Sequence, residues 1–510
     1  MKPKLTRREF LRFAKSLTLM PVLNFLPTHR DSHPLQGRAK PNIILILFDA
    51  LSANNLSLYG YPRQTSPNLE RFASRANVYH AHHSAANFTT PSTASLFTGT
   101  YPWTHRAFHL SSLITPAFRP KNLFGLVEGI YTTVAFTQNV YADMLLYQFQ
   151  DNIDNHVRLD SFTLVGNVFY NKYFARDGAY ALKAIDQFLF KRQEAHGSLL
   201  LSFLNDLDVL FQEKTIAERF ADIYPEGLPR LANTDLYYSL SQVTDGLRAE
   251  FDGLSTPSFF YIHLMPPHEP YVPTRQFLGS FSDGWSPPQK KKHRLAPGVA
   301  EERLVERRQT YDEFIANLDA EFGRLLEVME KSGLLDNSYV IVTSDHGELF
   351  ERGAHGHSTP LVFEPVVRIP LIISTPGQNV RNDIHALTSN IDLLPTILHL
   401  SGLPSAEWCE GGLLPGLGGV ISPERSIFIV ESKSNPAFSP LRKFTAAMIK
   451  GQYKIVRYMG YRNYKDEFEL YDLENDPEEF ENRYDPSHPI VKDLQHELEQ
   501  KLQEADQPYL

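Results

Sequence analysis

Residues 87–99 combine a cluster of hydroxyl side chains with a helix-like run that ends at Gly99. An isolated hydroxyl group is a weak nucleophile, but beside a divalent cation it can lose its proton and attack an ester. The pattern predicts that Ser92 or Thr93 caps the helix, whose positive end would then point back at Thr89. Thr89 is therefore a candidate nucleophile, provided that the chain also supplies a metal ion.

Two apolar runs of the sequence each end in an acid. Residues 41–49 end in Asp49, and residues 338–345 end in Asp345, which His346 follows. Continuous apolar runs are typical of strands covered on both faces, and functional groups gather at the carboxyl ends of such strands in open α/β sheets. With Thr89, these side chains would offer three oxygen donors and one imidazole, a set that suits a divalent cation.

The remaining pattern indicates the elements that position these residues. A long helix is predicted over residues 299–332, amphipathic helices near 179–192 and 236–254, and a final charged helix near 490–505. The fold class that we predict is α/β: a mostly parallel central sheet with helices on both faces in residues 39–423, and a smaller α+β subdomain in residues 424–510. Further strands are predicted over residues 77–83, 131–136, 258–264, 368–373, 426–430, 445–450, 453–458 and 468–473.

Composition narrows the class of protein. The chain has 510 residues and a net charge of −9, which argues against nucleic acid as a partner because no basic field is available for phosphate contacts. Cys409 is the single cysteine, so the chain has neither a disulfide framework nor a cysteine-based zinc site.

The amino terminus differs from the rest of the chain. Within residues 1–38, Arg7 and Arg8 precede a short apolar segment, which resembles a twin-arginine export signal. The segment is too short and polar for a confident transmembrane helix. The expectation is a periplasmic or other extracytoplasmic protein that meets the twin-arginine export machinery and stays at the membrane if the segment is retained. The alternative is a basic helical tail.

Several motifs in a specific order resemble those of the sulfatases and their relatives in the alkaline phosphatase superfamily. The resemblance extends over residues 40–480, nearly the whole chain. It implies an alkaline phosphatase-like fold in which Asp49, Thr89, Asp345 and His346 hold the catalytic metal and Thr89 is the nucleophile. The motifs are residues 42–49, 58–69, 89–92, 95–99, 267–271, 343–348, 356–357, 368–373 and 469–477.

Histidines outside the metal set also align with functional positions of that family. The resemblance implies that His268 and His357 contact the substrate anion or protonate the leaving group, which is chemistry that imidazole performs well. Glu348 is expected to support the site rather than to react. His355 fits equally well beside the site or in solvent.

The departures from the sulfatase pattern concern the chemistry directly. Sulfatases carry a cysteine or serine, oxidised to formylglycine, where this chain has Thr89, and an arginine where it has Thr93. Ala50 stands where sulfatases usually have a second acid, and His346 stands where many sulfatases have asparagine. The lysine expected after the third strand is absent, since residues 129–139 contain no lysine. A threonine nucleophile is similar instead to the phosphoglycerol and phosphoethanolamine transferases of the superfamily, which form a phospho-threonine intermediate.

Three functions are therefore open. The first is a metal-dependent hydrolase or transferase that acts on a phosphate ester of a lipid headgroup, glycan or small molecule through a covalent intermediate on Thr89. The second is a sulfuric ester hydrolase that works without formylglycine. The third is an inactive relative that binds glycans or lipid headgroups. The mixed oxygen and nitrogen ligands favour Mn, Mg or Zn over Ca, which stays open.

Overall fold

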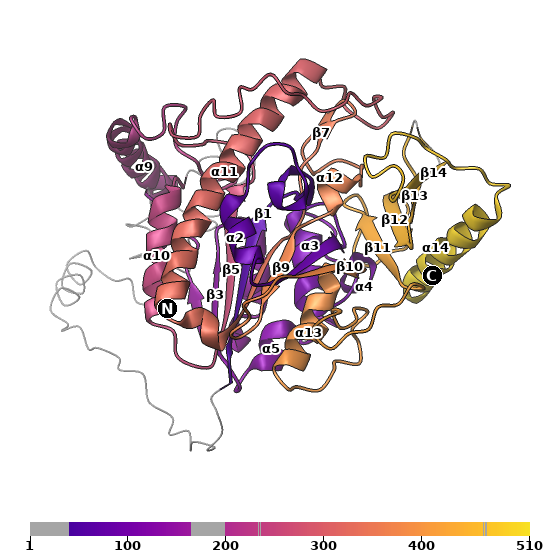
Figure 1. The fold of residues 1–510 in the computed structure, drawn as a ribbon, viewed down its shortest axis with the longest axis horizontal. Helices are drawn as coiled ribbons and strands as arrows, with labels where there is room; N and C mark the ends of the chain where they lie inside the picture. Colours follow the sequence, from indigo (N-terminus) through magenta and orange to yellow (C-terminus); the bar gives the residue numbers. More distant parts are fainter. Residues whose placement is uncertain (1–39, 165–198, 233, 235, 463, 465–466) are drawn as a thin grey trace, which may run out of the picture. The chain divides into compact units, whose positions relative to one another are not determined.

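An eight-stranded sheet lies at the centre of the computed structural model, which describes residues 40–164 and 199–510 apart from 233, 235, 463, 465 and 466 (Figure 1). The strand order is β10-β2-β9-β6-β1-β5-β3-β4, and β9 alone is antiparallel to its neighbours. This confirms the predicted mostly parallel sheet. The strands are β1 Asn42–Asp49, β2 Asn77–His83, β3 Thr132–Thr137, β4 Asn155–Val157, β5 Ser258–Pro267, β6 Ser338–Ser344, β9 Leu371–Ser374 and β10 Asn382–Ser389.

Strand β1 lies between β6 and β5 in the middle of the sheet, and every one of its residues is buried. Its alternate side chains face opposite layers: Ile44, Ile46 and Phe48 join one core cluster, and Ile43 and Leu45 join the other. The parallel neighbours β5 and β6 hold it on both sides. The carboxyl end of β1, where Asp49 lies, is therefore fixed by the most buried part of the fold.

Helices cover both faces of the sheet, as predicted. The first core cluster contains apolar residues of α2 Pro67–Ala73, α10 Leu240–Asp252 and α11 Glu301–Lys331. The second contains residues of the helices on the other face. These are α3 Thr89–Thr98, α5 Leu123–Val127, α6 Val140–Gln148 and α13 Leu393–Leu400. Outside these layers lie α4 Pro102–His105, α9 Leu199–Phe220 and α12 Glu364–Val367, together with the short strands β7 Phe350–Glu351 and β8 Ala354–His355.

A second, antiparallel sheet follows near the carboxyl terminus, with α14 Pro489–Asp506 packed against it (Figure 1, orange to yellow). This confirms the predicted smaller α+β region. Residues Lys40–Leu510 form one compact unit, and the boundaries at residues 38 and 423 stay predictions. The strands are β11 Ser426–Glu431, β12 Phe444–Lys450, β13 Tyr453–Met459 and β14 Glu467–Asp472.

Helix α3 begins earlier than the sequence pattern indicated. Thr89 is its first residue, and Phe88 occupies the N-cap, so the prediction that Ser92 or Thr93 caps the helix is wrong. Ser92 instead donates a hydrogen bond to the carbonyl of Asp345, and Pro91 needs no hydrogen-bond partner in the first turn. The helix ends at Gly99, whose φ of 67° lies in the left-handed region, as predicted.

Strand β10 was missed, since its residues alternate weakly between polar and apolar types. The predicted helix near residues 179–192 lies outside the described residues. In the part of the chain that the structure describes, no helix has both the length and the apolar character needed to cross a bilayer.

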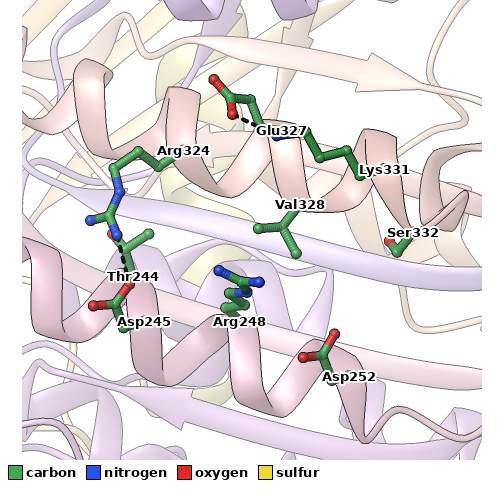
Figure 2. Close-up of a pocket in the computed structure, with 9 residues that line it drawn as sticks. All are labelled: Thr244, Asp245, Arg248, Asp252, Arg324, Glu327, Val328, Lys331 and Ser332. Atoms are coloured by element: carbon green, nitrogen blue, oxygen red, sulfur yellow. Dashed lines mark hydrogen bonds and ion pairs between the residues drawn. The ribbon is translucent and has the colours of Figure 1, made fainter.

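A shallow groove of about 310 Å³ lies between α10 and α11 (Figure 2). Its charged side chains largely pair with one another: Arg324 contacts Asp245 at 2.6 Å, and Lys331 contacts Glu327 at 3.1 Å. None of the predicted site residues lines this groove. The chemistry predicted from the sequence therefore lies elsewhere.

A buried ion cluster joins the carboxyl-terminal sheet to the central domain. Lys454 of β13 lies 3.0 Å from Glu364 and 2.9 Å from Glu479, and His83 of β2 contacts Glu364 at 2.9 Å. Lys454 has no exposed surface. Each charge in the cluster thus depends on the others for compensation.

Replacing Lys454 should destabilise the protein strongly. Lys454→Ala leaves two buried carboxylates without their cation, so we expect a loss of about 3–5 kcal/mol in the free energy of unfolding, measured by urea denaturation. Lys331→Ala, which removes an exposed pair with Glu327, is the matched control and should cost less than about 0.5 kcal/mol. Equal effects of the two substitutions would contradict this account of the cluster.

Candidate active site

The structure brings the four predicted metal ligands together at the carboxyl end of β1. Nε2 of His346 lies 3.5 Å from Oδ1 of Asp49 and 3.4 Å from Oδ2 of Asp345. Oγ1 of Thr89 lies 3.3 Å from the same Nε2. All four residues are buried, so their polar atoms face one another rather than solvent.

The backbone fixes the orientation of Asp345 and His346. Oδ1 of Asp345 accepts hydrogen bonds from the N–H groups of Ala50, at 3.2 Å, and His346, at 2.9 Å. Nδ1 of His346 lies 2.9 Å from the carbonyl oxygen of Gly347 and therefore donates to it. Because Nδ1 carries the proton, Nε2 presents a lone pair to the carboxylates and to Thr89, which is the state that a metal ligand requires.

His263 is a further member of this cluster that sequence reasoning missed. Its Nε2 lies 3.4 Å from Oδ2 of Asp49 and 3.9 Å from Oδ2 of Asp345, and Tyr261 contacts its Nδ1 at 3.0 Å. Donor atoms of Asp49, His263 and Asp345 all lie within 4.8 Å of one another. The signal in the sequence was a single imidazole inside an otherwise apolar strand, opposite Leu47 in the register of β1 and β5.

The polar atoms of this cluster are short of partners. Oδ1 of Asp49, Oδ2 of Asp345 and Nε2 of His263 are buried and have no hydrogen-bond partner among the described residues. Burial and the neighbouring Asp49 carboxylate raise the pKa of Asp345. Two adjacent carboxylates with converging imidazole nitrogens and unsatisfied atoms fit a divalent cation, which would supply the missing partners.

Asn139 is a second residue that sequence reasoning missed. It follows β3, where the resemblance led us to expect a lysine, and its Nδ2 donates to Oδ2 of Asp49 and, at 3.3 Å, to Oγ1 of Thr89. Its Oδ1 accepts from the N–H groups of Tyr141 and Ala142 and so caps α6. Because the cap fixes the amide, its NH₂ group must face Thr89, as an oxyanion donor would.

His268 and His357 lie together beside the metal ligands. Their rings are 4.9 Å apart, and the ring of His357 is 4.2 Å from that of His346. Burial opposes the charged form of His268, but the carboxylates of Asp49 and Glu348 raise its pKa. Burial, reinforced by the charge of His268, lowers the pKa of His357 to about 3. These opposite shifts make His268 the member of the pair that holds a proton more readily, and His357 the neutral one.

Glu348 and His355 support this pair from outside. Oε1 of Glu348 lies 3.0 Å from Nδ1 of His357, and its Oε2 accepts a hydrogen bond from Tyr271 at 3.0 Å. His355 contacts Tyr271 at 3.1 Å and also the guanidinium of Arg307. Glu348 thus contacts His357 directly, whereas His355 is linked to His357 through Tyr271 and Glu348.

Comparison with known proteins identifies the family of this chain. The sulfatase family matches residues 41–403, and the carboxyl-terminal region of N-sulphoglucosamine sulphohydrolase matches residues 353–508. The fold and the family together define an ester hydrolase of the alkaline phosphatase superfamily. Within that superfamily, the chain belongs to the sulfatase family.

Relatives and solved structures resemble most of the chain. A choline-sulfatase of Rhizobium meliloti is 25% identical over 472 residues, which are 87% of this chain and 82% of the relative. An N-acetylgalactosamine-6-sulfatase of Rattus norvegicus is 26% identical over 78% of this chain and 68% of the relative. The phosphonate monoester hydrolase of Agrobacterium radiobacter shares the fold, with a TM-score of 0.63 and 19% identity over 92% of this chain and 96% of that one.

Metal binding should stabilise the protein through the paired carboxylates. A cation at 100 times its Kd adds about 2.7 kcal/mol to the free energy of unfolding. In Asp345→Asn, the amide oxygen can keep both backbone hydrogen bonds, so the metal-free variant should melt no lower than the wild type but should lose the rise in Tm on adding Mn²⁺ or Zn²⁺. Asp336→Asn changes an exposed acid and serves as the control. An undiminished rise in Asp345→Asn would contradict the assignment.

His263 should contribute to the same binding event. His263→Ala removes one imidazole nitrogen, and we expect the concentration of Zn²⁺ needed for half of the Tm shift to rise by about 10-fold or more. Metal content after gel filtration, measured by mass spectrometry, provides an independent readout. An unchanged titration would show that His263 only fills space beside Asp49.

Proposed function

We propose that this protein is a metal-dependent hydrolase or transferase that acts on a phosphate ester through a covalent intermediate on Thr89. The observation that carries the proposal is the position of Oγ1 of Thr89, 3.3 Å from both Nε2 of His346 and Nδ2 of Asn139. The Thr89 hydroxyl thus lies between the Nε2 lone pair of His346 and the NH₂ group of Asn139. Such an arrangement suits a nucleophile.

The residues that would hold the metal are Asp49, Asp345 and His346 with Thr89, and His263 extends the set. When bound, the cation lowers the pKa of the Thr89 hydroxyl and screens the charge of the ester. Two imidazole nitrogens beside two carboxylates favour Mn²⁺ or Zn²⁺, and they disfavour Ca²⁺, which prefers oxygen ligands throughout.

In the first half of the reaction, Oγ1 of Thr89 loses its proton to solvent and attacks the phosphorus of the ester. A bond forms between Oγ1 and phosphorus as the bond to the alcohol oxygen breaks, and protonated His268 gives its proton to the departing alcohol. The NH₂ group of Asn139 and the positive end of α3 stabilise the charge on the phosphoryl oxygens.

In the second half, water or an acceptor alcohol attacks the phosphorylated Thr89 and releases the group. As the bond between phosphorus and Oγ1 breaks, the incoming nucleophile gives a proton to neutral His268 and the Thr89 oxygen takes a proton back from solvent, which restores the starting state. Glu348 holds His357 through its Nδ1 and so fixes the ring beside the reacting group. Whether water or an alcohol enters decides between hydrolysis and transfer, and both use the same residues.

Sulfuric ester hydrolysis is the second candidate. It is favoured by relatives whose names describe action on sulfate esters, including choline-sulfatase and N-acetylgalactosamine-6-sulfatase. Against it stand Thr89, which cannot give the formylglycine aldehyde, and the neutral Thr93 and Asn139 at positions where sulfatases carry cations. A phosphonate monoester hydrolase shares the fold, which supports action on an ester other than sulfate.

The third hypothesis, an inactive binding protein for glycans or lipid headgroups, receives less support. Unsatisfied buried atoms of Asp49, His263 and Asp345 fit a retained metal site. Purified protein without bound metal would favour this hypothesis. An extracytoplasmic location also stays a proposal, because Arg7 and Arg8 lie outside the described residues.

Removing the nucleophile should abolish turnover and leave the metal in place. Thr89→Ala should lower kcat for p-nitrophenyl phosphate by at least about 10³-fold, whereas Thr89→Ser should keep measurable activity because it retains a primary hydroxyl. Thr90→Ala is the matched control, since the Thr90 hydroxyl donates to the carbonyl of Leu110. Wild-type turnover in Thr89→Ala would refute the mechanism. Faster turnover of p-nitrophenyl sulfate than of p-nitrophenyl phosphate by one wild-type preparation would favour the second candidate.

A further inference from the structure

The site described above lacks an obvious cation for its anionic substrate. Asp49, Asp345 and Glu348 each bring a negative charge, which a divalent cation and protonated His268 would together balance. A phosphate monoester adds two further negative charges near neutral pH. The sulfatase pattern supplies an arginine and a lysine for this purpose, but here Thr93 and the amide of Asn139 stand at those places. Another cation is therefore required if a dianionic ester is to bind tightly.

We propose that Lys433, from the loop that follows β11 in the carboxyl-terminal sheet, supplies this cation and recognises anionic oxygens of the substrate on the side of His357. The ammonium group of Lys433 donates a hydrogen bond to the carbonyl of Ser358, the residue after His357. This inference rests on the proposed function, because it names a substrate-binding residue of the same site.

The loop that Lys433 touches is tied to the nucleophile from its other side. Nδ2 of Asn87, two residues before Thr89, donates to the carbonyls of His357, at 2.9 Å, and Thr359, at 2.7 Å. Lys433 and Asn87 therefore hold the same short segment. The ring of His357 is 4.2 Å from that of His346, so the segment that Lys433 contacts borders the ligand cluster.

The acid closest to Lys433 in the sequence, Glu431, already has other hydrogen-bond partners. Burial lowers the pKa of the Lys433 ammonium, and the charge of Glu431 acts in the opposite direction. Both carboxylate oxygens of Glu431 are engaged: Oε1 accepts from the backbone N–H of Lys433 at 3.2 Å, and Oε2 accepts from Tyr461 at 2.7 Å. Among the described residues, no carboxylate forms an ion pair with the Lys433 ammonium, which has three protons to donate.

Arg307 is the other cation near these histidines, and it is a weaker candidate. Its guanidinium is paired with Glu269 at 3.1 Å and also contacts His355. Recognition of a substrate anion by Arg307 would therefore have to compete with an existing ion pair. No carboxylate of the described residues lies within ion-pair distance of the Lys433 ammonium, and its half-buried position strengthens its attraction for an anion.

A set of three variants separates recognition of charge from simple support of the loop. Lys433→Gln keeps a donor for the carbonyl of Ser358 but removes the charge, and Lys433→Arg keeps the charge. Lys443→Gln is the control, because it removes the same charge from an exposed lysine that lies over the ring of Tyr461. Inorganic phosphate is the probe, and its binding to the Mn²⁺-loaded full chain is measured by calorimetry.

Lys433→Gln should weaken the binding of phosphate about tenfold, with Lys433→Arg and Lys443→Gln within about threefold of the wild type. In turnover assays, Lys433→Gln should raise KM for dianionic p-nitrophenyl phosphate more than for monoanionic bis(p-nitrophenyl) phosphate, with a small change in kcat. Wild-type phosphate binding by Lys433→Gln, or equal weakening by Lys443→Gln, would overturn the proposal. Phosphate binding does not depend on Thr89 chemistry, so failure of the proposed function would leave this result readable.

Discussion

The approach of two buried carboxylates, Asp49 and Asp345, is the constraint on which the rest of the site depends. The parallel pairing of β1 with β6 makes it unavoidable, because Phe48 lies opposite Ser344 and an acid follows in each chain segment. Oxygen atoms of the two carboxylates lie within 4.8 Å of one another. Two buried anions this close repel one another unless a cation or hydrogen-bond donors lie between them. The imidazole nitrogens of His263 and His346 lie 3.4 Å from Asp49 and Asp345, respectively, and the amide of Asn139 donates to Asp49.

The sequence predicted what depends on local pattern. The apolar run of β1 and the acids at the ends of β1 and β6 identified one edge of the sheet, and the parallel architecture then implied that the acids meet. The predicted start of α3 was wrong because Ser92 donates to the carbonyl of Asp345 instead of capping the helix. That contact exists only in the folded chain. His263 and Asn139 were missed for the same reason: their roles depend on the register of β5 and on the cap of α6.

The departures from the sulfatase pattern also gain a physical meaning. Asn139 stands where a lysine was expected, and its capped amide gives direction without charge. Charge then comes from farther along the chain, in Lys433 of the carboxyl-terminal region, which the ion cluster around Lys454 ties to the central domain. The acids at the edge of the sheet thus match the sulfatase pattern. The groups proposed to bind the substrate, Asn139 and Lys433, differ from that pattern in residue type and in position along the chain.

The central claim is that Thr89 carries the transferred group. The most direct test is to incubate the Mn²⁺-loaded protein with an isotopically labelled phosphate ester, quench it in acid, and locate the label by peptide mass spectrometry. The account predicts a phosphoryl group on the peptide that contains Thr89, absent from Thr89→Ala. Rapid turnover of the donor with no label on that peptide at any time would contradict it.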